Sequence, residues 1–135
     1  MAIEYVRVKR QIMVGAEPGI KYLARLFREQ DIDIDGLAKE VSESSTVSYP
    51  DVLACLKAFE IVVSRHILNG QAVKLPYLGH FIPKIEAQAM NTLSQVTPET
   101  VKRVTCRFYP SVAFTRSLKT VPVVEKNLEI TGLQQ

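Results

Sequence analysis

The spacing of apolar and polar residues changes twice along the chain, from alternation to helical steps and back to alternation. Residues 3–12 alternate between apolar and charged side chains, as at Val6 and Arg7, which predicts a half-buried β-strand. The breakers in the segment 15–19 indicate a turn. Residues 21–27 fit either a second strand or a short helix, and we favour the strand.

Two helices are predicted in the next third of the chain. Asp33 offers an N-cap carboxylate for a helix of about ten residues, because an acid there accepts amide hydrogens of the first turn and suits the helix dipole. Residues 48–51, Ser-Tyr-Pro-Asp, combine a capping hydroxyl, an early proline and an acid three residues after the cap. Apolar residues then recur at three- and four-residue steps until Asn69-Gly70, a left-handed stop signal. We therefore expect a long helix over residues 49–69.

After Gly70 the period returns to two and predicts strands. Residues 72–85 fit strands around a glycine-containing turn, residues 88–95 are rich in turn formers, and residues 97–99 resemble the start of a helical turn. Residues 102–109 alternate most regularly, and a short helix is expected from Pro110-Ser111. The tail at 121–125 could add an edge strand, because Pro122 argues against a central one. One face of the 102–109 strand holds Arg103, Thr105 and Arg107, and the other holds Val104, Cys106 and Phe108.

Composition is that of an ordinary globular domain, with 47% apolar and 23% charged residues in a chain of 135. No apolar stretch is long enough to cross a bilayer, and charges occupy the place of a signal peptide's apolar region. We therefore expect a cytoplasmic protein. Cys55 and Cys106 form no Cys-x-x-Cys pair, so both are expected to be small buried apolar residues.

Positive charge is concentrated in the second half of the chain. Residues 1–70 hold nine Lys/Arg and ten Asp/Glu, whereas residues 71–135 hold eight Lys/Arg and four Asp/Glu. This bias hints at a surface that faces a polyanion. Arg7, Lys9 and Arg10 are interpreted first as an exposed edge whose charges discourage aggregation, with nucleic-acid contact as the alternative.

No pattern of catalytic or metal-binding residues is apparent. His66 falls on the apolar face of the long helix and is expected to be hydrogen-bonded and partly buried, and His80 lies next to the Gly79 turn. Neither has ligands at metal spacing, and the acids at 31, 33 and 35 lack the glycine and terminal glutamate of a calcium loop. We expect no cofactor, no metal, no small-molecule substrate and no enzyme activity.

Several short motifs, in order, resemble those of HU/IHF-type bacterial histone-like proteins. The resemblance covers residues 33–120, and the strands before it are similar to a subgroup of HU-like proteins with an N-terminal extension. The motifs are Ser48-x-x-Asp51, Leu68-Asn69-Gly70, Val73-Lys74-Leu75-x-x-Leu78-Gly79-x-Phe81, Arg107-Phe108-x-Pro110 and Leu118-Lys119.

The resemblance implies an α+β fold: a helical base, a three-stranded antiparallel sheet, a short C-terminal helix and an extra N-terminal strand. It implies an intertwined homodimer whose arms reach around DNA, with Gly79 as a tight turn and Phe81 and Phe108 in the core. The expected organisation is an extension over 1–32 packed on the domain, an HU-like domain over 33–120, and a tail over 121–135.

Cations near the predicted sheet and the last helix are the candidate DNA contacts, because phosphate binding needs several positive charges on one surface. The alternative for Arg103 and Arg107 is that they only form the solvent-exposed face of a strand and do not contact DNA. The candidates are Lys84, Lys102, Arg103, Arg107, Arg116 and Lys119.

The chain departs from the family pattern at the arm. Residues 82–101 contain one cation, Lys84, and two acids, and they lack an Arg-rich tip with a proline wedge. Two functions therefore remain. The first is architectural, largely sequence-independent binding of double-stranded DNA by a nucleoid-associated homodimer. The alternative is a protein-interaction or scaffold module that has lost strong DNA binding.

Overall fold

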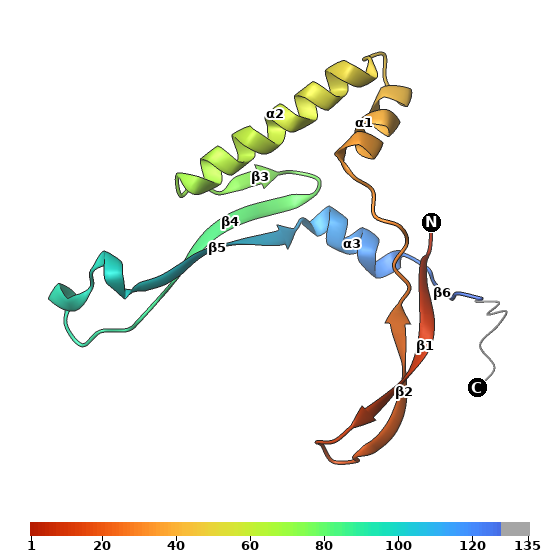
Figure 1. Ribbon diagram of the computed structural model, residues 1–135, viewed down its shortest axis with the longest axis horizontal. Helices are drawn as coiled ribbons and strands as arrows, with labels where there is room; N and C mark the ends of the chain where they lie inside the picture. Colours follow the sequence, from red (N-terminus) through yellow and green to blue (C-terminus); the bar gives the residue numbers. More distant parts are fainter. Residues whose placement is uncertain (128–135) are drawn as a thin grey trace. The chain divides into compact units, whose positions relative to one another are not determined.

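The computed structural model describes residues 1–127, which form two compact units, each with its own three-stranded sheet (Figure 1). The first unit combines residues 1–31 with residues 118–127, and the second unit is Ile32–Ser117. Within residues 1–127 the fold is α+β, with three α-helices and two sheets.

The sheet of the first unit is built from the two ends of the described chain. Strands β1 (Ile3–Ile12) and β2 (Gly19–Leu26) pair antiparallel, and β6 (Val123–Glu125) adds to β1 in parallel, giving the order β2-β1-β6. The strands predicted near 3–12 and 21–27 and the edge strand in the tail are confirmed. Because β6 pairs only with residues 3–5, the rest of β1 has a neighbour on the β2 side alone. Arg7, Lys9 and Arg10 therefore lie on an open, exposed edge of the sheet, as expected.

Lys126, directly after β6, contacts the first residues of β1. Its amide donates to the Tyr5 carbonyl at 2.8 Å, its Nζ lies 2.8 Å from Glu4 Oε2, and the same Nζ lies 4.9 Å from the centre of the Phe27 ring. The hydrogen bond and charge of Lys126 lower the pKa of Glu4 below its ordinary value.

The second unit begins with two helices, α1 (Ile34–Glu43) and α2 (Tyr49–Leu68). The predicted Asp33 cap is confirmed, because its Oδ1 accepts from the Gly36 amide at 2.9 Å. Ser48 is the N-cap residue of α2, as predicted, but its hydroxyl makes no capping bond. The hydroxyl instead donates to Asp51 Oδ2 at 2.8 Å.

A sheet with the order β3-β4-β5, antiparallel throughout, follows the helices. Its strands are β3 (Val73–Leu75), β4 (Gly79–Ala87) and β5 (Val101–Pro110). Between β4 and β5 lie two short 3-10 turns, η1 (Leu93–Gln95) and η2 (Pro98–Thr100), the second at the predicted helical turn. Gly79 begins β4 with φ 147°, and a Cβ there would lie 2.2 Å from the Tyr109 carbonyl oxygen. Only glycine allows the two strands to approach this closely.

Ser111 joins the sheet to the last helix, α3 (Val112–Thr120). Its hydroxyl donates to the Tyr77 carbonyl and accepts from the Phe114 amide at 3.0 Å, while its own amide donates to the Leu78 carbonyl at 2.9 Å. This buried side chain therefore caps α3 and holds it against the turn before β4.

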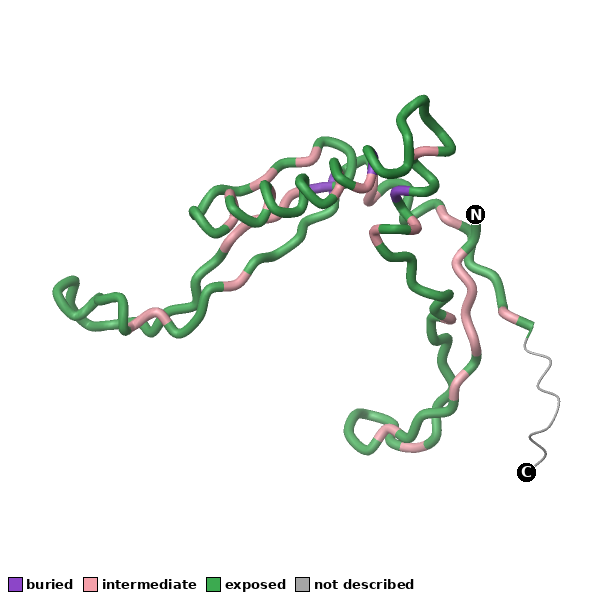
Figure 2. Tube along the Cα trace, turned by 45° about the horizontal axis from the view of Figure 1, so that its top comes forward, coloured by how far each residue is buried: buried purple, intermediate pink, exposed green. Residues whose placement is uncertain are grey.

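Few apolar side chains are buried within the described chain (Figure 2). Among residues 1–127, only Ala38 and Val52 are buried apolar residues. The expectation of buried cysteines is wrong, since Cys55 and Cys106 are both exposed. Phe108, expected in the core, packs 5.0 Å from Phe81 between ring centres yet remains 43% exposed. These side chains are therefore left uncovered within the described residues.

Candidate nucleic-acid interface

One face of the β3-β4-β5 sheet gathers positive side chains from all three strands. Residues that pair across neighbouring strands share a face, and so do alternate residues along a strand. We call the result the basic sheet face. Its members are Lys74 of β3, His80, Ile82, Lys84 and Glu86 of β4, and Arg103, Thr105, Arg107 and Tyr109 of β5.

Two cations of this face contact neighbouring side chains. The Lys84 ammonium lies 5.2 Å from the centre of the Tyr109 ring. A hydrogen bond from Lys84, reinforced by its charge and that of Arg107, lowers the pKa of Tyr109. The Arg103 Nε lies 2.5 Å from Glu86 Oε2, directly across the two strands. Both partners of this ion pair are more than half exposed, so water screens the pair.

Lys74 is a member that the sequence analysis missed. It sits opposite His80, which in turn sits opposite Tyr109. Its place on the basic sheet face follows only from the register of three strands. The motif around residues 73–81 contained Lys74, but strand alternation within the short β3 gave no reason to group it with β5.

The six predicted contact residues are divided by the structure. Lys84, Arg103 and Arg107 come together on the basic sheet face. Lys102 lies at the β-bulge opposite Glu86 and Ala87, where the regular alternation of side chains is interrupted. Arg116 and Lys119 lie on α3, outside this sheet, and Lys119 belongs to the first unit.

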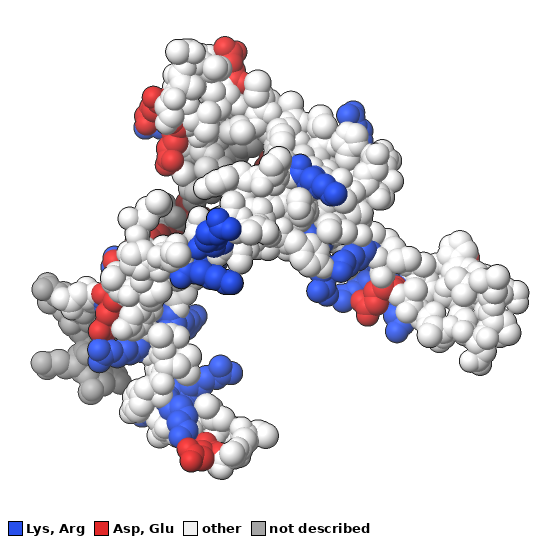
Figure 3. Space-filling model, turned by 180° about the vertical axis from the view of Figure 1, so that it is seen from behind, with Lys and Arg blue, Asp and Glu red and all other residues white. Residues whose placement is uncertain are grey.

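The distal part of the β4–β5 hairpin contains no charge. Residues 87–98 include no Lys, Arg, Asp or Glu, and Figure 3 shows blue side chains at the base of this hairpin and an uncoloured tip. Met90, Leu93 and Val96 in this segment are exposed, Leu93 by 91%. The positive charge of this hairpin is therefore confined to the part nearest the helices.

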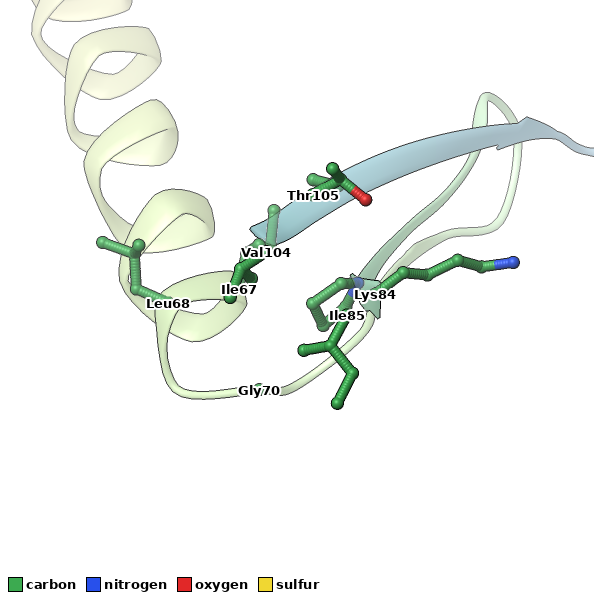
Figure 4. A pocket seen from close by; sticks show the side chains of 9 residues that line it. Ile67, Leu68, Gly70, Lys84, Ile85, Val104 and Thr105 are labelled. Atoms are coloured by element: carbon green, nitrogen blue, oxygen red, sulfur yellow. The ribbon is translucent and has the colours of Figure 1, made fainter. Parts of the chain in front are cut away.

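The reverse face of the hairpin borders an open apolar groove of about 650 Å³ (Figure 4). Ile67 and Leu68 at the end of α2 line one side, and Ile85, Val104 and Cys106 of the strands line the other. Lys84 extends away from the helix in this view. The two faces of the hairpin thus differ in kind, one basic and one apolar.

The two histidines and the possible metal ligands were also considered as candidate sites. His66 is half-buried, with Nδ1 2.7 Å from Gln71 Oε1, which confirms the expectation for this residue. His80 Nδ1 is buried without a hydrogen-bond partner. Residues 1–127 contain no cluster of three metal-ligating side chains. Within the same residues, no helix has the length and apolar character needed to cross a membrane.

Comparison with known proteins agrees with this architecture. Residues 1–126 match the model of the HU-HIG family, described as an HU domain fused to a winged helix-turn-helix, immunoglobulin or glycine-rich motif. The chain belongs to the HU-HIG family. None of the curated proteins matches it.

A solved structure supports the fold assignment of this HU-HIG member. The crystal structure of a bacterial protein from Bacteroides vulgatus ATCC 8482, to which DNA binding has been ascribed provisionally, superposes with a TM-score of 0.65 at 14% identity. The match covers 98% of this chain and 51% of the other, so the chain spans about half the length of that protein. At this identity the likeness concerns the fold alone.

Proposed function

We propose that this HU-HIG protein binds double-stranded DNA through the basic sheet face, as a homodimer that acts architecturally on the bacterial nucleoid. The observation that supports this most directly is the grouping of Lys74, Lys84, Arg103 and Arg107 on one exposed face with a single acid, Glu86. Several cations on one surface can neutralise several phosphates at once, and this releases the counterions condensed on DNA. The family description and the DNA binding ascribed to the Bacteroides protein agree with it.

Recognition in this proposal concerns the DNA backbone and shape rather than base edges. The basic sheet face offers ammonium and guanidinium groups but no asparagine or glutamine that would pair with adenine. The six residues expected from the sequence remain candidate contacts, and Lys74 joins them. No catalytic role is proposed for any of these residues.

A second copy of the chain is the proposed cover for the open apolar surfaces of the second unit. Phe59 and Val62 of α2 are 47% and 41% exposed, and with Cys55 and Ala58 they form a stripe at helical spacing. The apolar groove beside the β4–β5 hairpin and the exposed Phe108 add to this surface. In an isologous dimer the same patch of both chains lies in the interface, so the stripe of one chain would cover the stripe of the other. The helices would then form the base from which two sheets reach toward DNA.

A scaffold role is the second candidate, and the uncharged tip of the β4–β5 hairpin favours it. Exposed Leu93 and Val96 suit an apolar partner better than a phosphate groove. The same experiment decides between the two.

That experiment is equilibrium binding to short duplexes of unrelated sequence over a range of salt concentrations. If about four to eight phosphates are neutralised per dimer, the log–log salt slope is about −4 to −7. Replacing Arg103→Gln and Arg107→Gln should weaken binding to every duplex alike and make the slope shallower. Absence of binding by the unaltered protein at low salt would favour the scaffold role, and a loss confined to one sequence would contradict backbone recognition.

A further inference from the structure

The β1–β2 hairpin of the first unit is strongly basic, and the function proposed above does not use its charge. After Glu4, its two strands contain five Lys/Arg and no Asp/Glu. Arg7 is neutralised by Glu125 of β6 at 2.7 Å, and Lys21 reaches Glu17 in the connecting loop at 3.4 Å. Among the described residues, no acid lies within ion-pair distance of Lys9, Arg10 or Arg25.

Three of these cations share one face of the hairpin. Arg10 lies directly opposite Lys21, and Arg25 lies opposite Val6 on the same face. The pair Val8 and Leu23 separates the two positions. We call Arg10, Lys21 and Arg25 the hairpin basic face. The other face is less suited to an anion, because Arg7 is already paired there and leaves Lys9 alone.

The cross-strand pair of Arg10 and Lys21 is unfavourable in the free protein. Like charges directly opposite each other destabilise an antiparallel pair. Glu17 offsets this only weakly, because its contact with Lys21 is long and its side chain is 84% exposed. A bound anion between the two cations would relieve the repulsion and could replace Glu17 at little cost.

We propose that the hairpin basic face is a second surface for the phosphate backbone of duplex DNA, separate from the basic sheet face. The ligand is a polyanion rather than a single phosphate, because four residues of extended strand place Lys21 and Arg25 about 14 Å apart. A two-stranded ribbon also fits the major groove, which is about 12 Å wide. The remaining positions near these cations are apolar, so the backbone and not the bases is contacted.

The first test is salt-dependent duplex binding by the full chain with Arg10→Gln, Lys21→Gln and Arg25→Gln together. Glutamine keeps most of the side-chain length while removing the charge. Loss of two to three phosphate contacts per chain makes the log–log slope shallower by about 2 to 3 per chain. The matched control is Lys9→Gln on the opposite face, which should leave the slope unchanged. Arg10→Lys with Arg25→Lys should also keep it, and circular dichroism verifies that each variant is folded.

A footprint of the two hairpin lysines supplies a second readout. Duplex DNA should protect Lys21 from acetylation, measured by mass spectrometry, while Lys9 stays reactive. Equal protection of both lysines, or of neither, would overturn the assignment to this face.

Comparison with a variant of the basic sheet face, Arg103→Gln with Arg107→Gln, separates this proposal from the first one. A loss of binding from both variants supports both surfaces. A loss from the hairpin variant alone supports this inference and rejects the basic sheet face. A loss from the sheet variant alone overturns this inference, and an unaltered protein that binds no DNA overturns both.

Discussion

The two hairpins of this protein distribute charge in opposite ways. In β1–β2, Arg10 and Lys21 lie two residues from the ends of their strands nearest the connecting loop. In β4–β5, the cations lie toward the helices, and residues 87–98 at the far end are uncharged. A long hairpin can serve as a polyanion contact along its length or only at its base. The position of its cations, not its length, decides which.

The hairpins also differ in what lies behind them. The β4–β5 hairpin has an apolar reverse face that borders the end of α2, whereas β1 and β2 form their sheet with β6. The assembly of two chains proposed above would cover this apolar face.

The largest expected effect is the loss of that assembly. Phe59→Asp places a charge in the exposed stripe of α2 and should weaken dimerisation about 1,000-fold, because a hot-spot loss of about 2 kcal/mol counts twice in an isologous interface. Light scattering of the purified protein at micromolar concentration measures the mass. Lys57→Asp, on the same helix but off the stripe, is the control and should stay dimeric. An unaltered protein that is a stable 15 kDa monomer would contradict the proposed dimer.

The next effect concerns the uncharged tip. Smooth bending of a site by 40–90° costs on the order of 1–6 kcal/mol, which new contacts must offset. Because residues 87–98 offer no charge, the unaltered protein should bend DNA only slightly. Asn91→Arg with Ser94→Arg should increase the bend, whereas glutamine at both positions should not. Energy transfer on short duplexes measures the angle, and a large saturating bend by the unaltered protein would show that the tip acts without charge.

A smaller effect of opposite sign is expected at Glu86. Its carboxylate engages Arg103 at 2.5 Å and places a negative charge within the basic sheet face. Glu86→Gln should therefore tighten duplex binding a few-fold and steepen the log–log salt slope by about 1 per chain. Glu99→Gln in η2 removes an equal charge outside that face and is the matched control. Equal effects of the two variants would mean that only net charge matters.

The smallest effect concerns the base of the β1–β2 hairpin. Because Lys126 lowers the pKa of Glu4 in the folded chain, this contact stabilises the fold above the unfolded pKa of about 4.3 and is lost as pH falls through the lowered value. The protection of the Lys126 amide from hydrogen exchange, relative to its intrinsic rate at each pH, should fall in that acidic range, because this amide donates to Tyr5. In Glu4→Gln this pH-dependent loss of protection should disappear. The same acid response in that variant would assign it to another group.

Local signals predicted much of this fold, because they depend on neighbouring residues. The alternation of 3–12, the Asp33 carboxylate and the spacing of α2 each act within one element. The N-cap position of Ser48 was predicted correctly but its capping bond was not, because a hydroxyl can donate to Asp51 as well as accept from an amide. A sequence pattern does not choose between these two bonds.

The candidate site was harder to predict, because it depends on register. Arg103 and Arg107 could be grouped from a single strand, but Lys74 required the pairing of three strands, and the Glu86 partner of Arg103 lies 17 residues away. The bulge at Lys102 removes the alternation on which the sequence argument relied. The exposure of Cys55 and Cys106 was not predicted, because an apolar pattern within one element does not show which other surface, if any, covers it.

The parallel pairing of β6 with β1 has a consequence for synthesis of the chain. Val123 pairs with Ile3, so the third strand leaves the ribosome about 6 to 24 s after the first, at 5–20 residues per second. During that interval β1 and β2 form a two-stranded hairpin, which is only marginally stable in water. Ile3–Tyr5 then present an unpaired backbone edge to other nascent chains. The cations farther along the same strands repel such chains and protect the hairpin until β6 arrives.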